Sequence, residues 1–304
     1  MADLGYGRRR QREIYLAGLR GHKPRVSQNA VALERAAERA MTREGFAYIA
    51  GGAGLETTMR ANREAFERVR IVPRMLRGTE SRDLTVELFG RTLSAPFLLA
   101  PIGVLEMAHR DADLAVARSL WRVSRTYPGL VWHNLRSARP RQAAMTFVET
   151  FTRPTLNWDD VAFVREATRL PLLLKGILDP DDARTALDHG IDGIIVSNHG
   201  GRQVDGAIAS LDALPAVVSA VRETVPVLFD SGVRGGADVF KALALGAQAV
   251  LIGRPYCYGL AVAGEAGVRE VIRNFFADID LTLALTGCAG LTDIGSESVS
   301  FAHS

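Results

Sequence analysis

The sequence predicts an α/β fold, a TIM (β/α)8-type barrel, from three observations. Short uninterrupted apolar runs alternate with amphipathic helical patterns, which is typical of a parallel sheet covered by helices. Polar residues follow the carboxyl ends of several runs, and in a barrel those ends form the face where active sites lie. The first run leads into Ala100-Pro-Ile-Gly-Val104, which lacks the G-x-G-x-x-G pattern of a dinucleotide-binding sheet. A barrel is therefore favoured over an open, doubly wound sheet.

The first part of the chain precedes the barrel pattern. Residues 1–28 are polar and rich in arginine, and we interpret them as an N-terminal arm. Apolar positions recur at helical spacing over residues 29–43 and 56–69, with a glycine-rich stretch at residues 45–54 between them. These patterns predict two helices joined by a turn.

Five strands and four helices are predicted from the patterns that follow. The strands are the apolar runs at residues 97–100, 172–174, 193–196, 227–229 and 249–252. The helices are at residues 181–189, 213–223, 236–246 and 267–285. A closed barrel of this type has eight strand–helix units, so the sequence predicts an incomplete barrel.

Residues 118–146 are atypical for such a barrel. This stretch contains six arginines and no acidic residue, and only one strand, at residues 129–135, fits its apolar pattern. We expect one domain over residues 29–295 that includes this atypical segment. Residues 296–304 then form a C-terminal tail.

The composition excludes several classes of protein. The chain has 304 residues, 47% hydrophobic and 23% charged, which is an ordinary globular balance. The formal net charge of +3 is small, so no nucleic-acid partner is expected. Two cysteines, Cys257 and Cys288, are too few for a disulfide scaffold or a zinc site, so no metal is expected. Without an apolar leader or a span of about 18 apolar residues, we expect a cytoplasmic protein with no membrane partner.

The motif Ser197-Asn-His-Gly-Gly-Arg-Gln203 carries the most specific chemistry. His199 follows a buried strand, so it faces the mouth of the barrel, and an imidazole can take up a proton near neutral pH. Arg202 can clamp a carboxylate through two parallel hydrogen bonds. The alternative interpretation is a capped loop with a solvated arginine.

Three further strand ends carry polar groups. Lys175 follows an apolar run, where its charge is costly unless it faces a ligand or pairs with an acid of another strand. Leu228-Phe-Asp-Ser-Gly-Val-Arg-Gly-Gly236 and Leu251-Ile-Gly-Arg-Pro255 end the last two strands, where such barrels commonly bind phosphate. Their backbone amides and the side chain of Arg234 fit an anion. Ordinary strand-to-helix turns are the alternative.

Six motifs together resemble the family of FMN-dependent α-hydroxy-acid oxidases and dehydrogenases. They are Tyr48-Ile-Ala-Gly-Gly52, Arg60-Ala-Asn-Arg-Glu-Ala-Phe66, Ala100-Pro-Ile-Gly103, Leu174-Lys-Gly176, Ser197-Asn-His-Gly-Gly-Arg202 and Asp238-Val-Phe-Lys-Ala-Leu-Ala-Leu-Gly-Ala247. Pro73-Arg-Met-Leu76 and Phe229-Asp-Ser-Gly232 resemble the lactate 2-monooxygenase branch. The resemblance covers residues 30–117 and 147–295.

The resemblance implies FMN as the cofactor and a role for each matching residue. His199 would be the base at the α-carbon of the substrate, while Arg202 and Tyr48 would hold the substrate carboxylate. Lys175 would lie at the N1–C2 carbonyl edge of the flavin. The other residues expected at the flavin are Ser197, Ala100, Pro101, Ile102 and Gly103. Those expected at the ribityl phosphate are Asp230, Ser231, Gly232, Arg234, Gly253 and Arg254.

The chain departs from the resembled family in the atypical segment. Family members are longer there, so strands two to four of the family barrel are missing or replaced. Several groups that bind the flavin or face the substrate are lost with them. Our hypothesis for the lack of acidic residues in this segment is an internal deletion, with or without a shifted reading frame.

These observations support two main hypotheses. The first is an enzyme that oxidises a small L-2-hydroxy acid such as lactate to the 2-oxo acid, or to its oxidative decarboxylation product, with oxygen as acceptor and with reduced activity. The second is a catalytically inactive remnant that keeps only a phosphate or FMN site. A third, another phosphate-binding barrel such as an isomerase, conflicts with the His-Gly-Gly-Arg motif. The resemblance also implies a homo-oligomer.

Overall fold

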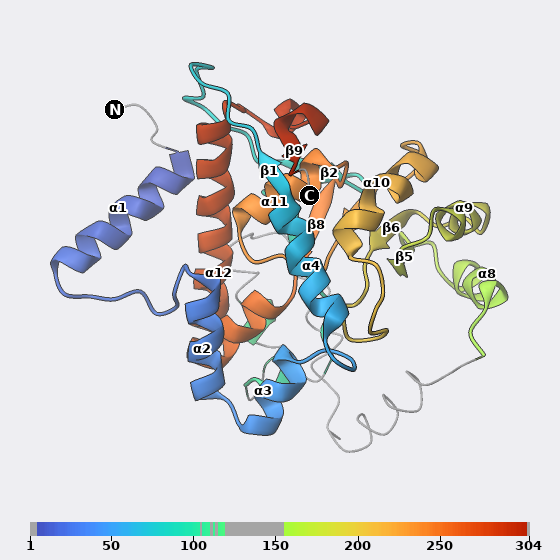
Figure 1. Cartoon of the computed structure of the whole chain (residues 1–304), viewed down its shortest axis with the longest axis horizontal. Helices are drawn as coiled ribbons and strands as arrows, with labels where there is room; N and C mark the ends of the chain where they lie inside the picture. The colour runs from blue at the N-terminus through green and yellow to red at the C-terminus, as the bar shows by residue number, and fades with distance from the viewer. Residues whose placement is uncertain (1–4, 104, 110–111, 113–114, 119–154, 303–304) are drawn as a thin grey trace.

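A computed structural model describes residues 5–103, 105–109, 112, 115–118 and 155–302 (Figure 1). The strand predicted at residues 129–135 lies outside the described residues. So does the atypical segment after its first residue, Arg118.

A five-stranded parallel sheet forms the centre of the described chain. Its strands, in spatial order, are β4 (Phe97–Leu99), β8 (Ala249–Ile252), β7 (Val227–Phe229), β6 (Gly193–Val196) and β5 (Leu173–Ile177). The first of these strands in the sequence pairs with the last, and Phe97 lies opposite Val250. First and last strands are neighbours in a barrel, whereas an open doubly wound sheet keeps them apart. The five predicted strands are confirmed, and within the described residues the barrel is not closed between β4 and β5.

The inner face of the sheet is filled by apolar side chains, as a small barrel requires. One cluster joins Leu88 to buried residues of the sheet, which are Ala100, Ile195, Leu228, Ala249 and Leu251. Leu88 ends β2 (Val86–Leu88), which forms a hairpin with β3 (Arg91–Leu93). Phe89, in the turn, lies against Gly193 at the start of β6. The hairpin, which the sequence analysis did not predict, therefore covers the amino-terminal end of the strands.

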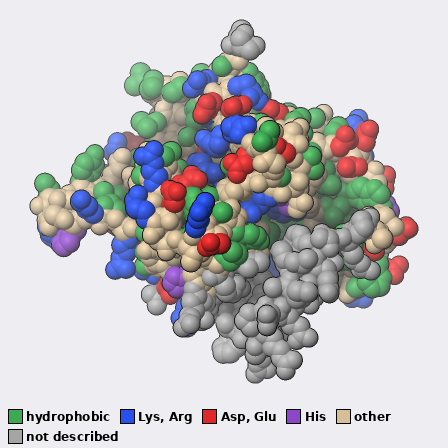
Figure 2. All heavy atoms as spheres, turned by 60° about the horizontal axis from the view of Figure 1, so that its bottom comes forward, with side chains coloured by type: hydrophobic (Ala, Val, Ile, Leu, Met, Phe, Trp, Pro, Cys, Tyr) green, Lys and Arg blue, Asp and Glu red, His purple; other side chains and the backbone are tan. Residues whose placement is uncertain are grey.

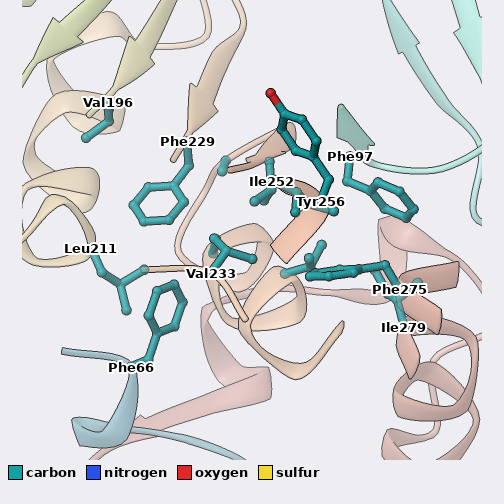
Figure 3. Close-up of a cluster of buried hydrophobic side chains, with 14 of the residues drawn as sticks. Phe66, Phe97, Val196, Leu211, Phe229, Val233, Ile252, Tyr256, Phe275 and Ile279 are labelled. Atoms are coloured by element: carbon teal, nitrogen blue, oxygen red, sulfur yellow. The ribbon is translucent and has the colours of Figure 1, made fainter. Parts of the chain in front are cut away.

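Helices cover the outer face of the sheet, with the larger apolar core between them (Figure 3). They are α4 (Thr57–Arg68), α8 (Trp158–Ala167), α9 (Pro180–Asp188), α10 (Ser210–Val221), α11 (Gly236–Ala244) and α12 (Arg254–Thr286). In Figure 3 the side chains of Phe66 and Phe229 point toward each other. Their rings pack edge to face, with the ring centroids 5.9 Å apart. Burying one such side chain stabilises the fold by about 1.5–3 kcal/mol. A kink at Ala263 and Gly264 divides α12 into two helices.

The N-terminal arm is more helical than predicted. Its residues form α1 (Gly5–Leu19), which packs along α12, and the N–H of Gly7 donates to Oδ2 of Asp280 (2.8 Å). The next helix, α2 (Ala30–Ala40), confirms the first predicted helix. The arm is thus attached to the body of the protein through α12.

The turn predicted at residues 45–54 is wrong over most of its length. Residues Arg43–Ala50 form helix α3. Thr42 caps this helix by accepting a hydrogen bond from the N–H of Gly45 (3.1 Å), and Ile49 is buried. Capping and packing therefore outweigh the low helix propensity of the glycine.

The C-terminal tail contributes to the fold. Its β9 (Val299–Phe301) pairs antiparallel with β1 (Val69–Ile71), which follows directly after α4. Three short 3-10 helices complete the described elements, at Leu105–Met107, Leu291–Asp293 and Ser296–Ser298. On the face shown in Figure 2, basic (blue) and acidic (red) side chains are interspersed over the described chain. Among the described residues, no helix has the length and apolar composition to cross a membrane.

Candidate active site

One pocket gathers the predicted site residues at the carboxyl ends of the sheet strands. Its volume is about 280 Å³, near the lower end of the range of small-molecule sites. The predicted residues that line it are Tyr48, Ala100, Pro101, Ile102, Gly103, Lys175, His199, Arg202, Asp230, Ser231, Gly232, Arg234, Gly253 and Arg254. Ser197 does not line the pocket but accepts a hydrogen bond from Nζ of Lys175 on its Oγ (2.8 Å).

His199 has a backbone conformation that few residues adopt. Its φ is 56°, in the left-handed region, and Gly200 and Gly201 follow in the same region. The N–H of His199 donates to Oγ of Ser197 (3.0 Å), and the N–H of Gly201 donates to Oδ1 of Asn198 (3.1 Å). Strain of this kind persists where surrounding contacts fix it, and it is common at functional sites.

The electrostatic surroundings of His199 favour a neutral imidazole. Partial burial lowers the pKa of His199, and the ammonium of Lys175 lowers it further, while the carboxylate of Asp230 has the opposite effect. A histidine with a lowered pKa is neutral at pH 7 and can accept a proton.

Lys175 belongs to a hydrogen-bonded network in the pocket wall. Its Nζ lies 2.8 Å from Oδ2 of Asp230, so it pairs with an acid of another strand, as the alternative interpretation held. Oδ1 of Asp230 accepts from Oγ of Ser231 (2.9 Å), and that Oγ accepts from the N–H of Gly200 (3.0 Å). A ribityl hydroxyl would therefore share a carboxylate of Asp230 that already accepts bonds within the protein.

Arg202 and Tyr48 also line the pocket, and they lie together. The guanidinium of Arg202 lies over the Tyr48 ring, with Cζ 5.2 Å from the ring centroid. Its Nη2 donates to the backbone carbonyl oxygens of Tyr48 and Ile49, which belong to the last turn of α3. The carboxyl end of a helix carries partial negative charge. Arg202 is thus directed at the partial negative charge at the end of α3. Among the described residues, no acidic side chain forms an ion pair with it.

The part of the pocket that is lined by Gly232, Arg234 and Gly253, the anion end, suits an anion. Gly253 precedes the first residue of α12, where backbone N–H groups and the helix dipole attract negative charge. Gly232 has a φ of +83°, and a Cβ there would lie 2.9 Å from a backbone oxygen of Asn62, so only glycine fits. Arg234 adds a guanidinium, and burial lowers the pKa of Arg234.

The side chain of Arg254 lies where the sequence analysis did not place it. Instead of facing the anion end, its guanidinium donates hydrogen bonds of 2.7–3.1 Å to four backbone carbonyl oxygens, those of Ile49, Ala50, Gly51 and Gly200. Burial lowers the pKa of Arg254 to about 10, and the charges of Arg234 and Arg202 contribute. Arg254 therefore remains charged at pH 7 and joins the end of α3 to the His199 loop.

Sequence reasoning missed four residues that support the site. Asn62 hydrogen-bonds Asn198 in the core, and both stood in the motifs of the family resemblance without a role. Asp205 caps α4, and hydrogen bonds, above all from the Thr57 side chain, lower the pKa of Asp205 to about 2. The hydroxyl of Tyr256 donates to the carbonyl oxygen of Ala100 (2.9 Å) and holds the first strand end. Their spacing in the sequence gave no signal of these contacts.

Comparison with known proteins agrees with this site. The chain matches the family described as FMN-dependent dehydrogenase over residues 37–127 and 120–301. L-lactate oxidase of Lysinibacillus sphaericus (strain C3-41) is 35% identical, and the alignment covers 85% of this chain and 89% of that protein. Glycolate oxidase 1 of Zea mays is 33% identical over 88% of this chain and 94% of its own. A crystal structure of mandelate oxidase has a TM-score of 0.79 at 32% identity, over 90% and 98% of the two chains.

The fold and the site together define an FMN-dependent α-hydroxy-acid oxidoreductase. The chain belongs to the FMN-dependent dehydrogenase family. The alignment with L-lactate oxidase spans 343 positions, more than the 304 residues of this chain, so that relative carries residues without a counterpart here. The two parts of the family match meet at residues 120–127, inside the atypical segment. Both findings support the predicted internal deletion.

The residues at the pocket fit FMN. The group carries a terminal phosphate, and the N-terminus of α12 with Gly232 and Arg234 offers donors for a phosphate at one end of the pocket. The flavin gains negative charge on reduction, and the ammonium of Lys175 lines the same pocket. His199 lines it as well and is available to a substrate.

Proposed function

We propose that this protein oxidises a small L-2-hydroxy acid such as lactate to the 2-oxo acid, with oxygen as the final acceptor. The observation that carries the proposal is that His199, whose pKa burial lowers, lines one pocket with Arg202 and Tyr48. The names of the relatives, L-lactate oxidase, glycolate oxidase and mandelate oxidase, agree in the class of substrate.

The chain's own residues would bind and orient the substrate. Arg202 exchanges its contacts with the carbonyls of α3 for the substrate carboxylate, which it can hold through two parallel hydrogen bonds. Tyr48 holds the same carboxylate. His199 then takes a proton from the α-carbon or from the hydroxyl of the substrate. FMN, when bound, supplies the two-electron oxidation and passes the electrons to oxygen.

We infer that the activity is reduced. The relatives carry residues that this chain lacks, and removing one preorganised donor from an active site costs about 2.7–4 kcal/mol of transition-state stabilisation. Residues 73–76 and 229–232 resemble the lactate 2-monooxygenase branch. The second reaction to test is therefore oxidative decarboxylation of the product before its release. Analysis of the product, pyruvate or acetate from lactate, distinguishes the two.

A second candidate function is a catalytically inactive remnant that binds FMN or phosphate alone. The observation that favours it is the same missing part of the chain, which falls between β4 and β5. Because the anion end of the pocket is built from described residues, phosphate binding would survive the loss of groups elsewhere.

The visible spectrum of the purified protein, before and after anaerobic addition of lactate, tests the proposal. We expect a flavin spectrum that bleaches with lactate. We expect His199→Ala to retain bound FMN but to reduce the flavin roughly 100- to 10,000-fold more slowly, the usual contribution of a general base. Wild-type lactate oxidation in that variant would show that His199 is not the base. A bound flavin that no 2-hydroxy acid bleaches would favour the remnant.

The family resemblance also leads us to infer a homo-oligomer. Light scattering of the protein in solution measures its mass, and a value of 32.9 kDa, the mass of one chain, would contradict this inference.

A further inference from the structure

Asn62 and Asn198 form a reciprocal amide pair in the core. Nδ2 of each side chain donates to Oδ1 of the other, both at 2.8 Å. Their exposed fractions are 2% and 5%. Asn62 lies on α4, and Asn198 lies 136 residues later, immediately before His199. The pair therefore connects a helix outside the sheet to the loop that carries the expected base.

Hydrogen bonds extend from this pair to both sides of His199. Oδ1 of Asn62 accepts from the N–H of Ser210 (3.1 Å), and Oγ of Ser210 accepts from the N–H of Asn198 (2.8 Å). Oδ1 of Asn198 accepts from the N–H of Gly201, two residues after His199. Directional bonds in a low-dielectric core fix geometry more strongly than apolar packing does. These hydrogen bonds therefore fix the backbone on both sides of His199, at Asn198 and Gly201, and so hold His199 in its left-handed conformation.

We propose that Asn62 is a positioning residue for the reaction, because its amide holds Asn198 and thereby keeps His199 in its strained conformation at the pocket. Asn62 does not line the pocket itself, so it acts through Asn198. The inference rests on the proposed role of His199 as the base. A shift of about 1 Å in a reacting group can cost roughly 100-fold in rate, so a small relaxation of this loop has a large effect.

Thr58 provides a matched control on the same helix. It is fully buried, its Oγ1 donates to the carbonyl oxygen of Val204 (2.9 Å), and this Oγ1 accepts from the N–H of Ala207 (2.8 Å). Thr58 thus also joins α4 to the segment after β6, but its hydroxyl bonds to Val204 and Ala207 and not to Asn198. Thr58→Val removes a structural connection of the same kind while leaving the frame around His199 in place.

The experiment compares Asn62→Ala with Thr58→Val in the FMN-loaded protein. The rate of flavin reduction by lactate, the dissociation constant of FMN and the pKa of His199 are measured, the last by NMR without substrate. Both variants are expected to lower the thermal midpoint and to leave FMN affinity unchanged. Only Asn62→Ala is expected to slow reduction by roughly 10- to 100-fold and to raise the pKa of His199 toward about 6.5, as the imidazole gains solvent.

Two results would overturn the proposal. One is an Asn62→Ala variant that slows reduction no more than Thr58→Val does. The other is an unchanged pKa of His199 in Asn62→Ala. If Asn62→Ala does not fold, Asn62→Asp keeps the size and the acceptor oxygen but loses the donor to Asn198, and the same comparison of rates applies. If lactate and other 2-hydroxy acids fail to reduce the wild-type flavin, the proposed function has failed, and the pKa of His199 still tests the positioning role.

Discussion

At the scale of single residues, the protonation state of His199 decides whether the pocket contains a base. Burial lowers the pKa of its imidazole most, the charge of Lys175 lowers this pKa further, and the charge of Asp230 raises it. Lys175 and Asp230 pair with each other, so they present a nearly neutral wall to the imidazole. The net result is a base that stays unprotonated at neutral pH without a strong charge beside it.

The pH dependence of the reaction follows from this lowered pKa. kcat/KM for lactate is expected to be constant above about pH 6.5 and to fall as the pH drops through the pKa of His199, because protonation removes the base. The folded state also resists this protonation more than the unfolded chain does. Stability is therefore lost as the pH falls below about 6.5. Urea unfolding from pH 5 to 8 should show a smaller loss in His199→Gln than in the wild type, and an equal loss would contradict the assigned direction.

At the scale of elements, the side chain of Arg254 joins α3 to the His199 loop. Arg254 bonds three carbonyl oxygens at the end of α3 and one in the loop, Gly200. Arg254→Lys keeps the charge but loses the planar fork of donors. We expect local opening of α3 to become easier by about 2 kcal/mol, the order of one charge-assisted hydrogen bond, so amide exchange accelerates roughly 30-fold there. Hydrogen exchange of a peptide from α3 measures this, and unchanged exchange would contradict the role.

The five strands could be predicted from the sequence, whereas α3 and the contacts of Arg254 could not. The strands β6, β7 and β8 are buried along their whole length, β4 and β5 are partly buried, and all five appear as apolar runs that can be recognised in the sequence. The helix α3 contains Gly45 and is followed by further glycines, and its cap and packing outweigh local propensity. The direction of the Arg254 side chain depends on α3, which is distant in the sequence. The pocket residues could therefore be named from motifs, whereas the contacts among them could not.

At the scale of the whole molecule, the described sheet ends in two edge strands, β4 and β5. β4 and β5 each pair with one strand among the described residues, while the inner core and the hairpin at the opposite end are those of a barrel. Unpaired edges of parallel strands expose backbone donors and acceptors that other chains can pair with. The alignment with L-lactate oxidase is longer than this chain, and the two parts of the family match overlap at residues 120–127, inside the atypical segment. The pocket end of the barrel is therefore expected to be the least stable part.

A chimera tests whether the missing part limits cofactor binding. Residues 104–154 are replaced by the matching segment of L-lactate oxidase from Lysinibacillus sphaericus, which restores the length of the relative. Each regained hydrogen bond is worth about 0.5–1.5 kcal/mol, so FMN affinity should rise by roughly tenfold or more, together with the thermal midpoint. A control chimera that exchanges only α8 (Trp158–Ala167), which has no buried residue and does not line the pocket, should leave FMN affinity unchanged. FMN titration by fluorescence measures the affinity. An unchanged dissociation constant in the first chimera would mean that the described half of the barrel already carries the complete FMN site.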